Sequence, residues 1–465
     1  MNPHLWTLTE TQNALNRGQL SYVELATWYL QRIEKYNPGL HAYITVAEDV
    51  VDKARMLDDK RAREVPVGPL AGALVAVKDL IDTAGIRTTY GGRHFTNHVP
   101  DVSATVVQRL EQAGAIVVGK TNLHEYAYGT TTENPHYGNA RNPWNKNKIA
   151  GGSSGGSSVA LSAGLCTAAL GTDTGGSIRI PAALCGHVGL KPSYGLVSKA
   201  GVFPLAPSLD HVGPMTKSVA DAALLLSVMA GPDVRDPSTV RLPVRSYKGA
   251  PLQRPIRLGI PANFFFDRCH PSVLQTVHAA LQQLQSSGVE LREVEIPMMS
   301  DAPEMQNVVI GSEALAVHEE LLATRKDEYG DDVRRRLDAA RSIGGSQYVA
   351  AADFRSRFRS ALKTVFANVD AVVTPTTGLP ATGIGQWKAH VKTVEVNVRA
   401  HLTRYTNPWN LSGLPALSLP CGTSPDGLPV GLQLVGPMYA DAKLLQVAAW
   451  VETVLGSTTL APEFR

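Results

Sequence analysis

Apolar positions near the start of the chain recur at helical spacing and predict two helices. Thr7 and Ser21 are each followed three residues later by a glutamate. This pattern is typical of a capping box, in which a hydroxyl and a carboxylate satisfy the first N–H groups of a helix. In the second helix, apolar residues stand at positions 23, 25, 26, 29, 30 and 33, before an Asn-Pro-Gly stop at 37–39. We therefore expect helices within residues 7–36.

Beyond these helices, short apolar runs alternate with amphipathic segments. The pattern predicts strands at 74–77, 115–118, 256–260, 289–296, 369–374 and 417–419, and helices at 101–113 and 273–285. Alternation of this kind is typical of an α/β protein with a parallel or mixed sheet. Residues 232–255, rich in Pro, Arg and Ser, are the best internal boundary. They are either a linker or a surface excursion within one domain.

Composition and charge narrow the classes of function. The 465 residues are 44% hydrophobic, which is enough for a large core. Lys+Arg (44) nearly balance Asp+Glu (41), and the basic run at 334–336 suits a solvated helix face better than a nucleic-acid surface. No signal peptide is visible, and the apolar window 159–170 is too short to span a bilayer. We expect a cytoplasmic protein that binds neither nucleic acid nor membranes.

The possible metal ligands show no ligand spacing. The four cysteines are far apart, with no CxxC pair, and the 13 histidines form no HExxH or other paired motif. Widely spread cysteines suit free thiols in a reducing compartment. The sequence therefore indicates no metal and no cofactor.

Two segments match the residue pattern of a known motif but not the local structure that the motif requires. Residues 114–121 fit the P-loop pattern, but their Ala-Ile-Val-Val core is itself a strand and cannot be an open phosphate-binding loop. Residues 151–155 fit the G-x-S-x-G nucleophile elbow, which requires an apolar strand just before it. Here the preceding residues 142–148 are loop-forming. Because His187 and His211 follow, a histidine partner stays open.

Two glycine-rich serine segments, at 151–157 and 171–179, are the main candidates for chemistry. Glycines beside a hydroxyl let backbone N–H groups turn toward a developing negative charge. A flexible linker is the alternative, but apolar residues follow each segment directly. Lys78, at the end of an apolar strand, either extends to solvent or is buried with a lowered pKa and accepts a proton. Ser–Lys pairs replace Ser–His pairs in several hydrolases.

Together these residues resemble the amidase signature family. The resemblance rests on Val-Lys-Asp at 77–79, Gly-Gly-Ser-Ser-Gly-Gly at 151–156 and Gly-Thr-Asp-Thr-Gly-Gly-Ser-Ile-Arg at 171–179. It covers 72–213 strongly and 410–436 well. It implies one α/β domain over residues 1–465, with a mixed sheet of about a dozen strands between helices. Within that domain, helices 7–36 pack on a catalytic core at about 70–215, and a variable segment at about 300–400 forms the substrate pocket.

The resemblance also implies a Ser–cisSer–Lys triad. In it Ser177 is the acylating nucleophile, Ser153 beside a cis peptide relays the proton, and Lys78 is the base. The oxyanion hole is expected from the backbone N–H groups of Thr174, Gly175, Gly176 and Ser177.

Other residues are expected to support the triad. Asp173, Arg179 and Ser154 would hold the loop, although an ordinary structural Asp173–Arg179 ion pair predicts much the same geometry. The substrate pocket is expected to include Tyr128, Thr130 and Thr131. Apolar residues at 305 and 308–310 indicate an apolar acyl group, and core packing explains them equally well.

Two functions follow from the resemblance. The first is a hydrolase that converts an amide to an acid and ammonia or an amine. The second is the ammonia-producing A subunit of a glutamine-dependent aspartyl/glutamyl-tRNA amidotransferase, which passes ammonia to a partner subunit. Residues 333–337 are similar to a basic segment of such subunits, whereas 200–211 resemble free amidases.

One position favours the hydrolase. The amidotransferase subunits carry an aspartate for the glutamine α-amino group seven residues before an asparagine that corresponds to Asn410. Thr403 stands there in this chain, and a buried ammonium without a carboxylate is poorly compensated. We therefore favour a hydrolase that acts on a small-molecule amide without nucleic acid, with a homodimer as one possible assembly. A non-enzymatic binding protein on this scaffold has no positive support, because all three triad residues are present.

Overall fold

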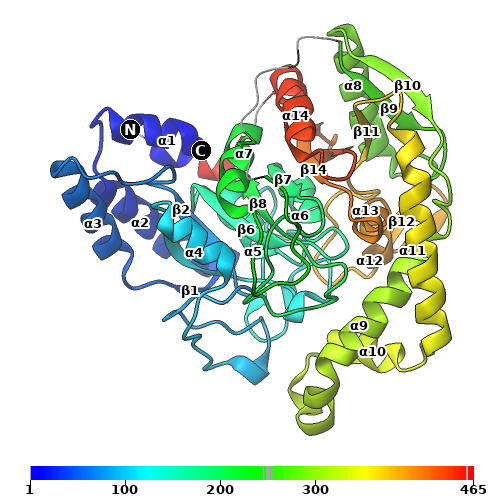
Figure 1. Ribbon diagram of the computed structural model, residues 1–465, viewed down its shortest axis with the longest axis horizontal. Helices are drawn as coiled ribbons and strands as arrows, with labels where there is room; N and C mark the ends of the chain where they lie inside the picture. Colours follow the sequence, from blue (N-terminus) through cyan, green and yellow to red (C-terminus); the bar gives the residue numbers. More distant parts are fainter. Residues whose placement is uncertain (1, 244–245, 248–251, 253–254, 457–458) are drawn as a thin grey trace.

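One large mixed sheet organises the chain. The computed structural model describes residues 2–243, 246–247, 252, 255–456 and 459–465 (Figure 1). Among these, eleven strands form one sheet in the order β1 (Tyr43–Val46), β3 (Ile116–Thr121), β2 (Leu74–Lys78), β6 (Ala168–Thr172), β8 (Val212–Thr216), β7 (Val188–Lys191), β14 (Ala416–Thr423), β15 (Pro429–Val435), β11 (Ala371–Pro375), β9 (Arg257–Pro261) and β10 (Glu290–Val294). Two small hairpins lie outside it, β4 (Glu133–Asn134) with β5 (Gly138–Asn139), and β12 (Lys388–Val391) with β13 (Val394–Asn397).

The strand directions confirm a mixed sheet. Strands β3, β2 and β6 are parallel neighbours at one end, as are β11, β9 and β10 at the other. The pairs between them, from β6 through β15 to β11, are antiparallel. Every residue of β2 and β6 is buried, so these strands show no polar alternation. Strands β6, β7, β8 and β15 were missed by the sequence pattern because each contains a glycine that interrupts its short apolar run.

Helices cover the sheet and extend beyond it. They are α1 (Leu8–Asn16), α2 (Tyr22–Leu40), α3 (Val50–Ala62), α4 (Thr105–Gln112), α5 (Gly155–Ser162), α6 (Arg179–Cys185), α7 (Val219–Met229), α8 (Pro271–Ser286), α9 (Ala302–Thr324), α10 (Asp331–Ala340), α11 (Gly345–Val365), α12 (Val398–Thr403), α13 (Asn407–Ser412) and α14 (Asp441–Leu455). Helices α5 and α6 contact the sheet as one group, and α7, α14 and α8 as another. Helices α9, α10 and α11 pack on one another and reach the core through α13 (Figure 1).

The N-terminal helices form as expected, with one difference at the end of α2. Both capping boxes are present, at Thr7 with Glu10 and at Ser21 with Glu24. Helix α2 continues through Pro38 to Leu40, and its C-cap residue His41 has a left-handed φ of 52°. Pro38 removes only one N–H bond, and the backbone N–H of His41 still donates to the Asn37 carbonyl at 2.8 Å. The expected stop is therefore the last turn of the helix.

The segment 232–255 joins two parts of the same sheet, because β8 precedes it and β9 follows it. Residues 244–245, 248–251 and 253–254 of this segment lie outside the described residues. Within the described part of the chain, no helix has both the length and the apolar character needed to cross a membrane.

Candidate active site

Lys78, the last residue of β2, is fully buried. Parallel pairing of β2 with β6 sets Val77 opposite Leu170 and carries Lys78 to the end of β6. There its Nζ lies 2.7 Å from Ser153 Oγ and 2.7 Å from Thr172 Oγ1. Burial lowers the pKa of Lys78 to about 7, against the opposing influence of Asp173 and Asp210. Near neutral pH the amine is thus neutral in a large fraction of molecules and can accept a proton.

The two candidate serines lie on different segments, and Ser153 is the one that contacts this lysine. Ser153 follows a cis peptide bond from Gly152 and is fully buried. Ser177 borders a cavity, and its backbone carbonyl accepts a hydrogen bond from the Ser154 N–H at 3.2 Å. The Ser177 hydroxyl has no hydrogen-bond partner among the described residues. The structure therefore joins Lys78 to Ser153 and holds the Ser177 backbone against Ser154, the residue after Ser153, without a bond between the Ser153 and Ser177 hydroxyls.

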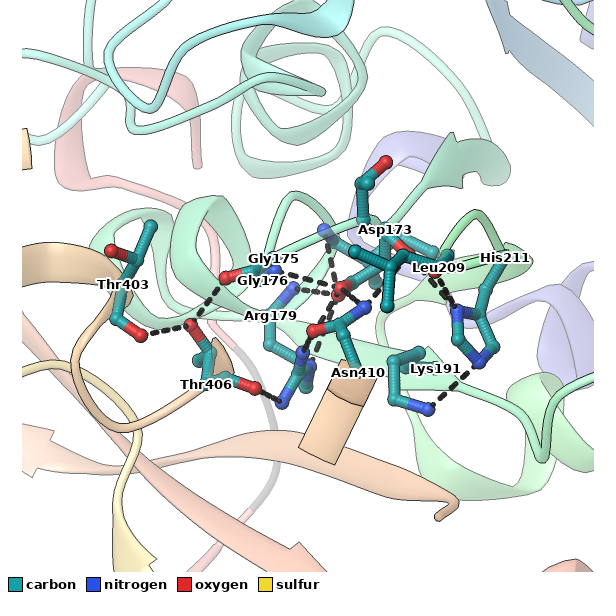
Figure 2. Close-up of polar contacts among 12 residues, drawn as sticks. Asp173, Gly175, Gly176, Arg179, Lys191, Leu209, His211, Thr403, Thr406 and Asn410 are labelled. Carbon is teal, nitrogen blue, oxygen red and sulfur yellow. Dashed lines mark hydrogen bonds and ion pairs between the residues drawn. The ribbon is translucent and has the colours of Figure 1, made fainter. Parts of the chain in front are cut away.

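The loop around the second serine is organised by the Asp173 carboxylate (Figure 2). Its Oδ1 accepts from the Gly176 N–H at 2.8 Å and its Oδ2 from the Ile178 N–H at 3.1 Å. The Gly176 N–H is therefore occupied, which corrects its expected place in the oxyanion hole. The N–H groups of Thr174, Gly175 and Ser177 donate to no acceptor in the described part of the chain.

A buried ion pair fixes this carboxylate. Arg179 donates to Asp173 from Nε at 3.0 Å and from NH2 at 2.9 Å, and both side chains are fully buried. Asn410 donates to Asp173 Oδ1 at 2.8 Å and accepts from Arg179 at 2.5 Å. Burial would raise the pKa of Asp173, but Arg179, Lys191 and Asn410 outweigh it and hold that pKa well below its usual range. The carboxylate stays ionised, so the loop keeps its anchor.

Among the described residues, no histidine side chain bonds to the hydroxyl of Ser153 or Ser177, although the His124 backbone N–H donates to the Ser153 carbonyl at 3.1 Å. His187 bonds to Ser158 at 2.6 Å and His211 to Lys191 at 3.2 Å. Burial lowers the pKa of both imidazoles, to about 4 for His187. The histidine partner that the G-x-S-x-G match left open is thus not formed. The P-loop match is also structural, because residues 116–121 form β3 and the Lys120 ammonium donates to the Ile81 carbonyl at 2.5 Å.

A cavity of about 650 Å³ opens at Ser177. Tyr128 and Thr130 line it, as expected. Thr131 is not among the lining residues, and its hydroxyl lies 3.4 Å from His124 Nδ1. The segment 300–400 contributes to the lining through α9, α10 and β13. Of the apolar residues at 305 and 308–310, only Ile310 reaches the cavity, while the others pack in the core.

The charged side chains that line the cavity are mainly arginines. Four arginines line it, and the single carboxylate among its described lining residues is Glu395, which pairs with Lys388 at 2.7 Å. The lining arginines are Arg268, Arg336, Arg399 and Arg404.

Two of these arginines flank one tyrosine. The guanidinium carbons of Arg336 and Arg399 lie 5.7 and 5.2 Å from the ring centroid of Tyr128. Arg336 also pairs with Asp332 at 2.5 Å. Burial, and then the nearby Arg399, lowers the pKa of Arg336 to about 9. Arg399 has no carboxylate partner among the described residues, so the cavity carries uncompensated positive charge.

Several site residues were not found from the sequence. Thr172 holds Lys78, and Asp210 accepts from the Thr174 hydroxyl at 2.6 Å while burial raises its pKa to about 6. Gln306 and Thr406 donate to the backbone carbonyls of Thr174 and Gly175, in the loop of residues 173–178 around Ser177, which we call the serine loop. Thr172, Asp210 and Asn410 stood in segments that the resemblance had marked, at 171–179, 200–211 and 410–436, but these contacts were not predicted. Gln306 and Thr406 come from elements outside those segments and have no local sequence signature.

A large mixed sheet, a buried lysine bonded to a serine and a second serine between glycines together fit a C–N hydrolase of the amidase class. The model of the family described as Amidase matches residues 24–445. The chain belongs to the amidase family.

The chain is similar to several known proteins of this family. The A subunit of glutamyl-tRNA(Gln) amidotransferase from Syntrophobacter fumaroxidans is 38% identical, with all of both chains covered. The crystal structure of the same amidotransferase component from Thermotoga maritima is 34% identical, with a TM-score of 0.81 over 97% of this chain and 95% of the other. A structure described as a vestigial protein complex that reveals the origins of an s-triazine catabolic enzyme is 31% identical, with a TM-score of 0.93 over 98% and 100% of the chains.

These relatives correct two expectations. Proteins named as the A subunit of a tRNA amidotransferase support the second of the two functions better than the stand-alone hydrolase. The prediction of a protein whose sole partner is a small-molecule amide, with no nucleic acid, is wrong, because the relatives are named as one component of an enzyme of glutamyl-tRNA. The near balance of Lys+Arg and Asp+Glu argues only against nonspecific binding of nucleic acid. It gives no information on whether the protein is a subunit of a larger enzyme.

Proposed function

We propose that this protein is a serine amidase that releases ammonia from a carboxamide and acts as the ammonia-producing subunit of an amidotransferase assembly. The observation that carries the amidase step is the Lys78 amine, buried and 2.7 Å from Ser153 Oγ. The subunit role is supported by 38% identity over the full length of the A subunit of a glutamyl-tRNA(Gln) amidotransferase.

The residues would act in sequence. Neutral Lys78 takes the proton of Ser153, which takes the proton of Ser177, and the Ser177 oxygen attacks the amide carbonyl. Closing the relay requires the Ser177 hydroxyl to turn toward Ser153 when the amide binds. The oxyanion is held by the free N–H groups of Thr174, Gly175 and Ser177, at about 3–4 kcal/mol for each donor. The same relay returns the proton to the departing nitrogen, and water then cleaves the acyl-enzyme to an acid.

The charge of the cavity supports a donor with a carboxylate. Arg336 and Arg399 converge on Tyr128, and only Arg336 has a carboxylate partner among the described residues. A carboxylate on the donor would compensate Arg399, because a charged hydrogen bond contributes about 1.5–3 kcal/mol. Glutamine meets this requirement, but its ammonium would face Thr403 or the already paired Glu395. We therefore propose that the desamino analogue of glutamine, glutaramate, binds at least as well.

Ammonia release distinguishes these statements. Purified protein is given glutamine, glutaramate or uncharged pentanamide, and a Ser177→Ala variant serves as the blank. We expect glutaramate to be hydrolysed at least as fast as glutamine, and pentanamide at least tenfold more slowly. Absence of ammonia from every amide would contradict the amidase step. Equal rates for glutaramate and pentanamide would contradict only the carboxylate site.

The subunit role needs a separate measurement. Native extract is depleted of the protein with an antibody, and the conversion of glutamyl-tRNA(Gln) to its amide is followed. We expect depletion to stop the conversion, and wild-type protein, but not Ser177→Ala, to restore it. Unchanged conversion after depletion would refute the assembly while leaving the amidase step intact.

Location and domain organisation complete the proposal. All four cysteines are free and buried, which suits a reducing compartment and supports a cytoplasmic location. The continuous sheet supports one amidase domain over residues 1–465.

A further inference from the structure

The unbonded N–H groups of Thr174, Gly175 and Ser177 are each oriented by a different set of contacts. In a planar trans peptide, the carbonyl of one residue and the N–H of the next point in opposite directions. The direction of each free N–H is therefore set by whatever binds the carbonyl before it. For Thr174, Gly175 and Ser177 the relevant carbonyls are those of Asp173, Thr174 and Gly176.

Two of these carbonyls are held firmly. The Asp173 carbonyl accepts from the His211 backbone N–H at 3.1 Å and from Asn410 Nδ2 at 2.9 Å (Figure 2). The Gly176 carbonyl accepts from the Ile180 N–H at 2.7 Å, at the entry to α6. Backbone partners in a buried region are difficult to displace, so the N–H groups of Thr174 and Ser177 have fixed directions.

The middle carbonyl depends on one side chain. Gln306 Nε2 donates to the Thr174 carbonyl at 2.7 Å, and this is the single hydrogen bond to that carbonyl in the described part of the chain. The residues that follow are Gly175 and Gly176, whose lack of a Cβ leaves the neighbouring backbone dihedrals permissive. Without Gln306, little would prevent the Thr174–Gly175 peptide from rotating and turning its N–H away from the site.

Gln306 belongs to both the loop and the cavity. It lies on α9, is fully buried and is among the residues that line the cavity. A backbone carbonyl only accepts, so the nitrogen of the side-chain amide must face it and Oε1 is left on the other branch. That Oε1 has no hydrogen-bond partner among the described residues. A bound amide that donates to Oε1 would hold the same side chain more firmly.

We propose that Gln306 is a positioning residue that directs the Gly175 N–H into the oxyanion hole. This inference rests on the proposed amidase step at Ser177. A residue of α9, outside the glycine-rich motifs, would then control how well the Gly175 N–H stabilises the oxyanion. The neighbouring Gly175 carbonyl is held by Thr406 Oγ1 at 2.7 Å, and its plane is also fixed by the Gly176 N–H bond to Asp173 (Figure 2).

A Gln306→Met variant removes the donor at nearly constant size. We expect kcat for the best amide of the panel to fall about 100-fold, as for loss of one oxyanion donor, while KM changes less than threefold. Glu304→Gln is the matched control, since Glu304 is exposed on the same helix and does not line the cavity. Thermal unfolding of each variant shows that the protein remains folded.

A Gln306→Glu variant separates positioning from packing. Its carboxylate cannot donate to the Thr174 carbonyl, but its protonated form can. The ratio of variant to wild-type kcat should therefore rise as the pH falls from 8 to 5.5. An active wild type with Gln306→Met within threefold of its kcat would overturn the inference, as would a Gln306→Glu ratio that does not change with pH. An inactive wild type would instead overturn the amidase step itself.

Discussion

The ionisation of Lys78 predicts the pH dependence of the reaction. Burial lowers the pKa of this lysine from 10.5 to about 7, and only the neutral amine can accept a proton from Ser153. The value of kcat/KM should therefore rise with pH and level off above pH 8. The sign follows from the direction of the shift, because a base with a lowered pKa becomes active at lower pH.

The expected size of the effect comes from the same value. With a pKa of about 7, roughly half of the Lys78 amines are neutral at pH 7 and about one in eleven at pH 6. The rate at pH 6 should thus lie about tenfold below the plateau. A lysine with the usual pKa of 10.5 would be neutral in only about one molecule in 3,000 at pH 7, and the rate would continue to rise to about pH 10.

The assay is ammonia release from glutaramate between pH 5.5 and 10, with kcat/KM determined at each pH. Lys217→Met is the control. Burial lowers the pKa of Lys217 as well, to about 8, but its ammonium bonds to the carbonyls of His4 and Trp6 at the N-terminus. The control should leave the midpoint unchanged. A midpoint above pH 9 in the wild type, or one that moves in Lys217→Met, would refute the assignment of the base to Lys78. Nearby His211 cannot supply the midpoint, because burial and Lys191 hold its pKa well below 6.5.

Three further predictions concern the cavity, the nucleophile and the buried ion pair. Arg399→Ala should raise KM for glutaramate about 10–100-fold and leave KM for pentanamide unchanged; equal changes would remove Arg399 from donor recognition. Ser177→Ala should lower kcat by about 10⁴ or more, and residual activity within tenfold of wild type would exclude this nucleophile. Asp173→Ala leaves the Arg179 charge buried and unpaired, so urea unfolding should report a loss of about 3–5 kcal/mol. The control Asp353→Ala breaks an exposed ion pair on α11 and should leave the urea midpoint unchanged. Equal losses of unfolding free energy in the two variants would show that the buried pair stabilises the protein no more than a surface pair does.

Much of the fold was predictable because local patterns have local causes. Capping boxes and helical periodicity located α1 and α2, and apolar runs located β2, β3 and β9. The order of the strands was not predictable from these patterns, since it depends on pairings between distant segments. Strands such as β6 and β8, buried on both faces, carry no alternation that distinguishes them from other apolar runs.

The sequence by itself determined the chemical groups of the site: a lysine at a strand end, two serines among glycines, and Asp173 close to Arg179 in the chain. Tertiary structure decided what those groups can do. Pairing of β2 with β6 buried Lys78 and lowered its pKa, and the Asp173 carboxylate accepts a hydrogen bond from the Gly176 N–H. It also brought Gln306 from α9, 132 residues from Thr174, to the remaining loop carbonyl. Burial and hydrogen-bond direction are properties of three-dimensional packing, so no motif within one segment could specify them.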